Sequence, residues 1–225
     1  MDPQNESLKR IIKSYINAII ATALTLFLPA GTIFYWQAWI FMVLFSVPMM
    51  LIAAYLFKRS PELLKRRLEV KEKKPGQSII AKMFYISVCL FFIVSGLDKR
   101  FGWSSVPLVI VIVSEILFLA GYLFLFLVFK ENKYLAHTIV VEEDQKVVST
   151  GPYAVVRHPM YLAELIMFIF APLALGSYWA IIVNALLISL LAVRIVTEEE
   201  ILLEELKGYR EYTGKTRYRL VPGIW

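Results

Sequence analysis

The sequence predicts an all-α integral membrane protein with about six transmembrane helices. Of its 225 residues, 59% are hydrophobic and only 19% are charged, a composition too apolar for an ordinary soluble domain. The apolar residues gather in runs close to the roughly 20 residues that a helix needs to cross a bilayer. The predicted spans cover about residues 11–29, 34–57, 79–97, 106–129, 160–176 and 178–196.

The basic residues predict that both termini face the cytoplasm, because loops that stay in the cytoplasm carry the excess of positive charge. With a cytoplasmic N-terminus, all of the 24 lysines and arginines lie on that side except Lys99 and Arg100. The net charge of +6 is thereby assigned to topology and to contact with anionic membrane lipid, and no nucleic-acid partner is expected. The expected membrane is the inner or plasma membrane of a prokaryote or the endoplasmic reticulum of a eukaryote.

Two regions are predicted along the chain. Residues 1–129 form a four-helix transmembrane region, whose basic cytoplasmic loop 58–77 is expected to hold a short amphipathic helix on the membrane surface. Residues 130–225 form the expected catalytic region, and β-prone segments within 138–148 predict a small surface hairpin there. Glu115 lies inside the fourth span and is interpreted as structural. Two histidines and one cysteine are too few for a metal site, so no metal is expected.

The stretch 151–161, GPYAVVRHPMY, concentrates polar chemistry immediately before an apolar run. Pro159 is predicted to begin a helix, since the N–H that proline lacks would be unpaired at that position. The free amide groups of this helix start favour an anion beside Arg157 and His158. The alternative interpretation is a juxtamembrane loop with one anchoring arginine.

The last two spans form a predicted antiparallel hairpin, 160–196, because only Gly176 and Ser177 separate them. Counting outward from that turn brings the start of the first arm level with the acidic cluster after the second arm. The residues expected to meet at this depth are His158, Tyr161, Arg194, Glu198 and Glu199.

A cytoplasmic helix is predicted to cover this end of the hairpin. Thr197 and Glu200 match the spacing of a capping box, which predicts that a new helix begins at Thr197 and ends near Thr213. The helix and the basic tail beyond it would close a cofactor pocket over the hairpin. Glu164 lies three residues after Tyr161 and on the same helix face.

With these motifs the last third of the chain resembles the isoprenylcysteine carboxyl methyltransferase family of membrane enzymes and its prokaryotic relatives. The shared features are the GPY and VRHPMY motifs, a short helical hairpin, a glutamate pair, two spaced tyrosines and a basic segment ending in proline. In this chain they are 151–161, Glu198 and Glu199, Tyr209 and Tyr212, and 217–222. Lys215 stands where members that methylate prenylated cysteine often have arginine, which leaves the acceptor open.

The resemblance implies S-adenosylmethionine as the methyl donor, held in a cytoplasm-facing cavity, and a lipophilic acceptor that enters from the bilayer. It assigns the cofactor pocket to Tyr153, His158, Pro159, Tyr161, Glu198, Glu199 and Tyr212. The residues expected near the acceptor or the chemistry are Arg157, Glu164, Arg217 and Arg219.

The function that the sequence favours is carboxyl O-methylation of an isoprenylcysteine-like substrate. Three alternatives stay open: a phospholipid amine N-methyltransferase, an NADPH-dependent membrane reductase of the sterol type, and a non-enzymatic carrier that uses Glu115 and Glu164. The oligomeric state is left undetermined.

Overall fold

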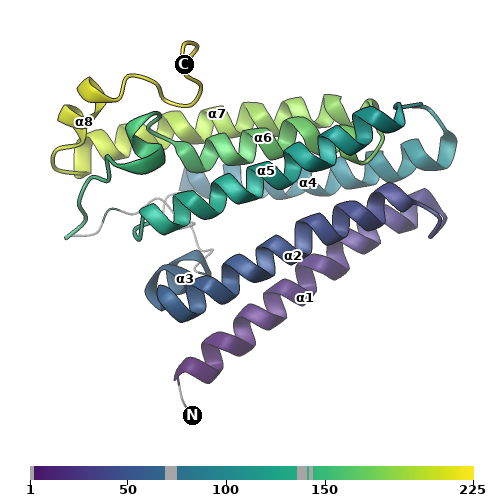
Figure 1. The fold of residues 1–225 in the computed structure, drawn as a ribbon, viewed down its shortest axis with the longest axis horizontal. Helices are drawn as coiled ribbons and strands as arrows, with labels where there is room; N and C mark the ends of the chain where they lie inside the picture. The colour runs from purple at the N-terminus through teal and green to yellow at the C-terminus, as the bar shows by residue number, and fades with distance from the viewer. Residues whose placement is uncertain (1–2, 69–74, 136–140, 142–143) are drawn as a thin grey trace.

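The computed structural model describes residues 3–68, 75–135, 141 and 144–225, and it is helical throughout apart from connectors and an isolated bridge between Val156 and Tyr218 in these residues (Figure 1). Its helices are α1 (Pro3–Ala30), α2 (Trp36–Arg59), α3 (Pro61–Leu68), α4 (Pro75–Phe101), α5 (Leu108–Glu131), the 3-10 turn η1 (Gly151–Ala154), α6 (Pro159–Ala174), α7 (Trp179–Glu205) and α8 (Tyr209–Lys215).

Five of the described helices are long and apolar enough to cross a membrane: α1, α2, α4, α5 and α7. They coincide with five of the six predicted spans, which confirms the class of α-helical integral membrane protein. The sixth predicted span forms α6, which has 16 residues and is shorter than the others. The number of six spans therefore stays a prediction, as do the sides that the termini face.

Close helix crossings hold the bundle together. α5 lies along α6, while α4 packs against α1 on one side and α7 on the other. A side chain at Gly96 would place its Cβ 2.4 Å from the carbonyl oxygen of Leu26, so glycine is what lets α4 approach α1 this closely. Small residues are typical of such crossings because helices in lipid associate through tight packing.

The two ends of the bundle differ in what they carry. α3 and α8 lie at the same end, which we call the α8 end, and the turn between α6 and α7 lies at the opposite end, the turn end (Figure 1). At the turn end the buried carboxylate of Asp98 accepts hydrogen bonds from the Oγ atoms of Ser177 (2.5 Å) and Ser104 (2.6 Å) and from the Ser104 amide (2.7 Å).

The short helix predicted within loop 58–77 is confirmed as α3. One of its faces packs against the other helices. Leu63 and Leu64 are buried against the rest of the bundle. Their spacing from Arg67 directs this arginine toward the same inward face. The predicted hairpin within 138–148 falls in part on residues outside those described.

The predicted helix start at Thr197 is wrong. α7 continues without a break to Glu205, and the Thr197 hydroxyl donates back to the carbonyl of Val193 at 2.9 Å. The helix continues because buried Ile195 and Glu199 and half-buried Leu202 lie on one face that packs through this region, so the threonine bonds within the helix in place of capping a new one. The separate helix is α8, which begins after Gly208 in a left-handed conformation (φ 86°).

Candidate functional site

The C-terminal tail folds onto the start of α6. The amide of Arg157 donates to the carbonyl of Tyr218 and the amide of His158 donates to the carbonyl of Arg219, both at 2.9 Å. These bonds join segments 61 residues apart and bring the tail beside the RHP corner. The tail is therefore part of the site's framework.

A buried ion-pair cluster fastens this arrangement. Glu199, only 2% exposed, accepts a hydrogen bond from Arg157 Nε at 2.5 Å and a second from Arg219 Nε. Arg157 Nη1 also donates to the carbonyls of Thr216 (2.9 Å) and Arg217 (2.7 Å). Because one carboxylate holds two guanidinium groups, the cluster ties α7 both to the loop before α6 and to the tail.

A second polar chain links α6 with α7. The Tyr161 hydroxyl donates to Glu198 at 2.5 Å and accepts from Arg194 Nε at 3.1 Å. This contact confirms the register that the sequence predicts for the hairpin, with Tyr161 level with Arg194. His158 and Glu199 also meet, with 3.9 Å between His158 Nε2 and the carboxylate.

Two tyrosines at the α8 end, Tyr153 and Tyr212, join three elements through hydrogen bonds. The Tyr212 hydroxyl donates to the carbonyl of Tyr153 at 2.6 Å, and Asn132 donates its amide to the Tyr153 hydroxyl at 2.9 Å. Burial raises the pKa of Tyr212 to about 12, so the phenol stays protonated and serves as a donor. These bonds join η1, α8 and the end of α5.

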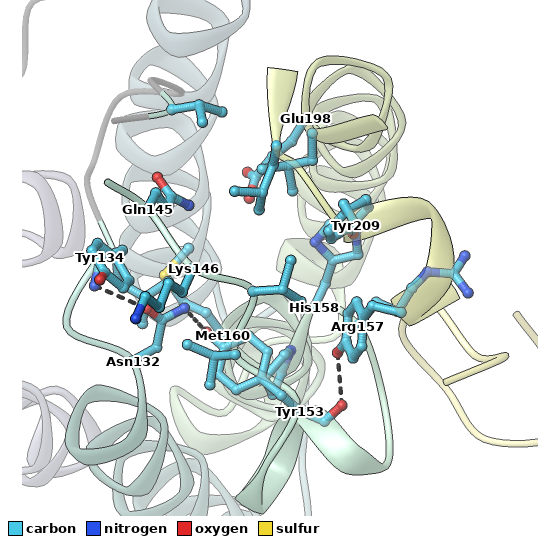
Figure 2. A pocket seen from close by; sticks show the side chains of 18 of the residues that line it. Asn132, Tyr134, Gln145, Lys146, Tyr153, Arg157, His158, Met160, Glu198 and Tyr209 are labelled. Carbon is cyan, nitrogen blue, oxygen red and sulfur yellow. Dashed lines mark hydrogen bonds between the residues drawn. The ribbon is translucent and has the colours of Figure 1, made fainter. Parts of the chain in front are cut away.

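Between these elements lies a cavity at the α8 end, which encloses about 830 Å³, including the open solvent at its mouth. Glu198, Tyr209 and His158 lie on one side of it and face Asn132 and Tyr134 on the other (Figure 2). The lining residues are Asn132, Tyr134, Leu135, Val141, Gln145, Lys146, Val147, Val148, Tyr153, Arg157, His158, Pro159, Met160, Tyr161, Arg194, Glu198, Leu202, Leu206, Tyr209 and Tyr212.

Two buried polar atoms in this lining lack a hydrogen-bond partner within the described part of the chain. They are His158 Nε2 and the Tyr209 hydroxyl oxygen. Burial lowers the pKa of His158 despite the nearby carboxylates of Glu198 and Glu199, so the ring is neutral at pH 7. A buried polar atom without a partner is costly, and its exposure to a cavity is typical of a ligand site.

The structure brings most of the predicted site residues to one cavity. Among the described residues that line it are Tyr153, Arg157, His158, Pro159, Tyr161, Glu198 and Tyr212. Glu199 and Arg219 lie behind this wall in the ion-pair cluster, Arg217 is exposed on the tail, and Glu164 lines a neighbouring cavity. Direct contacts of these four with a ligand stay predictions.

Several lining residues were not among the site residues predicted from the sequence, and Arg194 and Tyr209 are the most informative. Tyr209 belongs to the motif of two tyrosines but was expected only to pack. Arg194 lies one helical turn before Glu198, a spacing that already placed it at the level of the site. Met160 lies within the 151–161 motif but was given no role, and Lys146 carried no signal beyond its nearness to that motif.

The fold and the cavity together define an α-helical integral membrane protein with a candidate ligand site at the α8 end. Residues 111–204 match the model of the isoprenylcysteine carboxyl methyltransferase (ICMT) family, which confirms the resemblance found in the sequence motifs. The match covers α6, all but the last residue of α7, and the RHP corner.

Among solved structures, the eukaryotic intramembrane Ras methyltransferase ICMT (isoprenylcysteine carboxyl methyltransferase) is similar to this chain at 21% sequence identity. The alignment covers 91% of this chain and 73% of that one, with a TM-score of 0.47. No curated protein sequence matches the chain.

Proposed function

We propose that this protein is an S-adenosylmethionine-dependent methyltransferase that acts on a lipophilic acceptor in the membrane, with carboxyl O-methylation of an isoprenylcysteine-like substrate as its reaction. The observation that carries the proposal is the family match over residues 111–204, since this stretch supplies the RHP corner and the two arms that line the cavity at the α8 end, which we now call the cofactor cavity. The cavity would face the cytoplasm, where the methyl donor is made.

The residues of the cofactor cavity fit the proposed donor. The two buried atoms without partners, His158 Nε2 and the Tyr209 hydroxyl, are suited to the polar edge of a nucleoside. Glu198 would pair with the donor's ammonium group, and the amides at the start of α6 would receive its carboxylate. The tyrosines offer aromatic faces to a sulfonium cation.

The reaction would need positioning more than a nucleophilic side chain. An acceptor oxygen forms a bond to the donor's methyl carbon while the carbon–sulfur bond breaks and leaves its electron pair on sulfur. No proton has to be removed from an ionised carboxylate, so no general base is required. The chain's contribution would be to align the reactants, exclude water and balance charge, with Arg157 and Glu199 holding the tail in place over the cavity.

Donor binding separates this proposal from its alternatives. Calorimetry on the detergent-purified protein is expected to detect S-adenosylmethionine and not NADPH, and His158→Ala and Tyr209→Phe should each weaken donor binding by about tenfold because each removes a buried hydrogen bond. Arg210→Ala, an exposed neighbour of Tyr209, is the matched control and should bind as the wild type does. Binding of NADPH in place of the methyl donor would favour the reductase, and binding of neither would favour a carrier.

The stability of the product in base distinguishes a carboxyl O-methyltransferase from a phospholipid amine N-methyltransferase. With a donor labelled in its methyl group, a carboxyl ester releases its label in mild base, whereas a methylated phospholipid amine keeps it. Arg217→Gln and Arg219→Gln, assayed separately, test whether the tail cations contact the acceptor. A raised KM for the acceptor with unchanged donor affinity is the result expected of a contact.

A further inference from the structure

One cation of the buried ion-pair cluster rests on an aromatic ring. The guanidinium carbon of Arg219 lies 5.7 Å from the centre of the Trp225 ring, within the distance of about 6 Å at which a cation is attracted to the face of an aromatic ring. The same guanidinium donates through Nε to Glu199. Arg219 therefore lies between an indole that supports it and the carboxylate that it holds.

A turn in the tail brings Trp225 back to Arg219. The backbone oxygen of Trp225 accepts from the amides of Leu220 at 2.9 Å and Val221 at 3.2 Å, and the Trp225 amide donates to the carbonyl of Val221 at 3.1 Å. Gly223 permits this reversal, because it takes a left-handed conformation (φ 82°) that side chains disfavour. The half-buried indole packs against the same core as buried Leu220, so its position is fixed.

Arg219 depends on this support more than the other arginine of the cluster does. The side chain of Arg157 is 9% exposed, and two backbone carbonyls of the tail also accept from it. The side chain of Arg219 is 38% exposed, and the structure shows it in contact with the Glu199 carboxylate and the Trp225 indole. Because a partly exposed arginine loses much rotamer freedom when it is fixed, the indole contributes to holding it at Glu199.

The carboxylate of Glu199 stops just short of the histidine of the cofactor cavity. Its Oε1 atom lies 3.9 Å from His158 Nε2, beyond the limit of about 3.2 Å for a hydrogen bond. Arg157 Nε bonds with Oε1 and Arg219 Nε with Oε2, so arginines engage both oxygens. His158 Nε2 is thereby left without a hydrogen-bond partner in the described part of the chain. A movement of the carboxylate by about 1 Å would let it take up this nitrogen.

Several charged and titratable groups surround the His158 ring. They are Glu198, Glu199, Arg157, Arg219, Tyr161 and Tyr209. Glu198 is bonded to Tyr161 and Glu199 to the arginines, so the structure pairs each carboxylate with a group other than the ring. Burial then outweighs the attraction of the carboxylates and lowers the pKa of His158.

We propose that Trp225 is a positioning residue of the cofactor cavity. Its indole holds Arg219 in place, and Arg219 holds Glu199 away from His158. The imidazole Nε2 is thereby kept free for a ligand. The inference rests on the proposed function for the identity of that ligand, S-adenosylmethionine. Trp225 lies beyond the basic segment 217–222 and outside every motif of the family resemblance.

The first test follows the His158 ring with no donor present. The chain has two histidines, so full-length protein that carries His137→Gln and isotope-labelled histidine has one ring to titrate by NMR. Trp225→Leu removes the aromatic face and keeps an apolar side chain. Glu199 is then expected to bond with His158, and the pKa of the ring should rise because a carboxylate partner favours its charged form. Trp225→Phe keeps an aromatic face and should titrate as the parent protein does.

Ile224→Ala is the matched control, since Ile224 lies in the same turn and is 82% exposed. It should leave the titration unchanged. Arg219→Gln should raise the pKa of His158, and adding Trp225→Leu to it should change the titration no further, because the indole acts through Arg219. An unchanged titration in Trp225→Leu, equal changes in Trp225→Leu and Trp225→Phe, or additive changes in the double variant would overturn the proposal.

Calorimetry with S-adenosylmethionine separates this inference from the proposed function. Trp225→Leu and Arg219→Gln are each expected to weaken donor binding by about fivefold, since His158 Nε2 is no longer free, and Trp225→Phe by less than about twofold. Donor binding that Trp225→Leu and Arg219→Gln leave unchanged would refute only the positioning role and would leave Arg219 to the acceptor. Absence of donor binding to the wild type would refute the methyltransferase, while the histidine titration would still decide whether Trp225 acts on His158.

Discussion

Asp98 and Glu199 are two carboxylates of nearly equal burial, each 2% exposed, that hold opposite ends of the same helical hairpin. At the turn end Asp98 accepts from the hydroxyls of Ser104 and Ser177 and from one backbone amide. At the α8 end Glu199 accepts from the guanidinium groups of Arg157 and Arg219. The uncharged donors fasten a turn, while the charged donors fasten the C-terminal tail beside a cavity.

The two carboxylate clusters differ in whether the buried polar atoms beside them have hydrogen-bond partners. The hydrogen bonds of Asp98 close one short connection, and the neighbouring Ala180 amide is satisfied by Ser177 Oγ at 3.1 Å. The hydrogen bonds around Glu199 leave two nearby atoms, His158 Nε2 and the Tyr209 hydroxyl oxygen, without partners among the described residues. A buried atom without a partner also occurs at the turn end, Gln37 Oε1 beside Gly176, but at the α8 end His158 and Tyr209 line a cavity in which a ligand could supply the missing partners.

The largest effect is expected from Glu199→Gln. Removing the carboxylate leaves Arg157 and Arg219 without their charged acceptor, and breaking one partner of a buried ion pair commonly costs about 3–5 kcal/mol. Hydrogen exchange should show faster exchange of residues 209–225, and donor affinity should fall. Glu200→Gln, an exposed neighbour, is the control. Unchanged exchange in the tail would show that the cluster does not hold it.

At the turn end, Asp98→Ala should cost about 3 kcal/mol, since it removes three hydrogen bonds and leaves the buried Ser177 hydroxyl without its acceptor. Thermal unfolding in detergent measures the loss, with Lys99→Ala as the exposed control. Donor affinity, measured well below the unfolding temperature, should stay at the wild-type value. A fall in donor affinity would contradict the separation of the two ends.

Gly96→Ala tests packing in the same half of the bundle without touching either carboxylate. The new Cβ would meet the Leu26 carbonyl oxygen at 2.4 Å, so α1 and α4 must move apart at a cost of about 2 kcal/mol. Gly214→Ala is the matched control, because a Cβ there meets nothing within 4 Å. The same thermal assay applies, and equal unfolding temperatures for the two variants would contradict the close crossing.

The smallest effect is a pH dependence at the α8 end. Burial depresses the pKa of His158, so the unfolded chain takes up a proton before the folded one as pH falls below about 6.5. Stability should therefore decrease with falling pH between the usual histidine pKa and the lowered one, by at most about 1.4 kcal/mol per pH unit. His158→Gln should remove this contribution. The control His137→Gln leaves His158 in place and should retain it. Identical pH profiles for His158→Gln and the wild type would contradict a neutral buried ring.

Much of this architecture follows from local sequence. The five long spans are visible as apolar runs, Pro159 begins α6 as its missing N–H requires, and the short turn at Ser177 sets the register that brings Tyr161 to Arg194. The prediction of a helix start at Thr197 is wrong, and the reason is also physical. A capping pattern is only a local preference, and the continuous buried face of α7 outweighs it.

The sequence by itself determined the membrane class, the hairpin and the level at which polar residues gather, because hydropathy and the rise of about 1.5 Å per residue act along one chain segment. Only the tertiary structure decided which partners those residues take. From the sequence, several cations could pair with Glu199. The fold of the tail brings Arg157 and Arg219 to it. Arg67 reaches the sulfur of Met160 because α3 packs inward, and such pairings depend on segments far apart in the chain that compete for the same space.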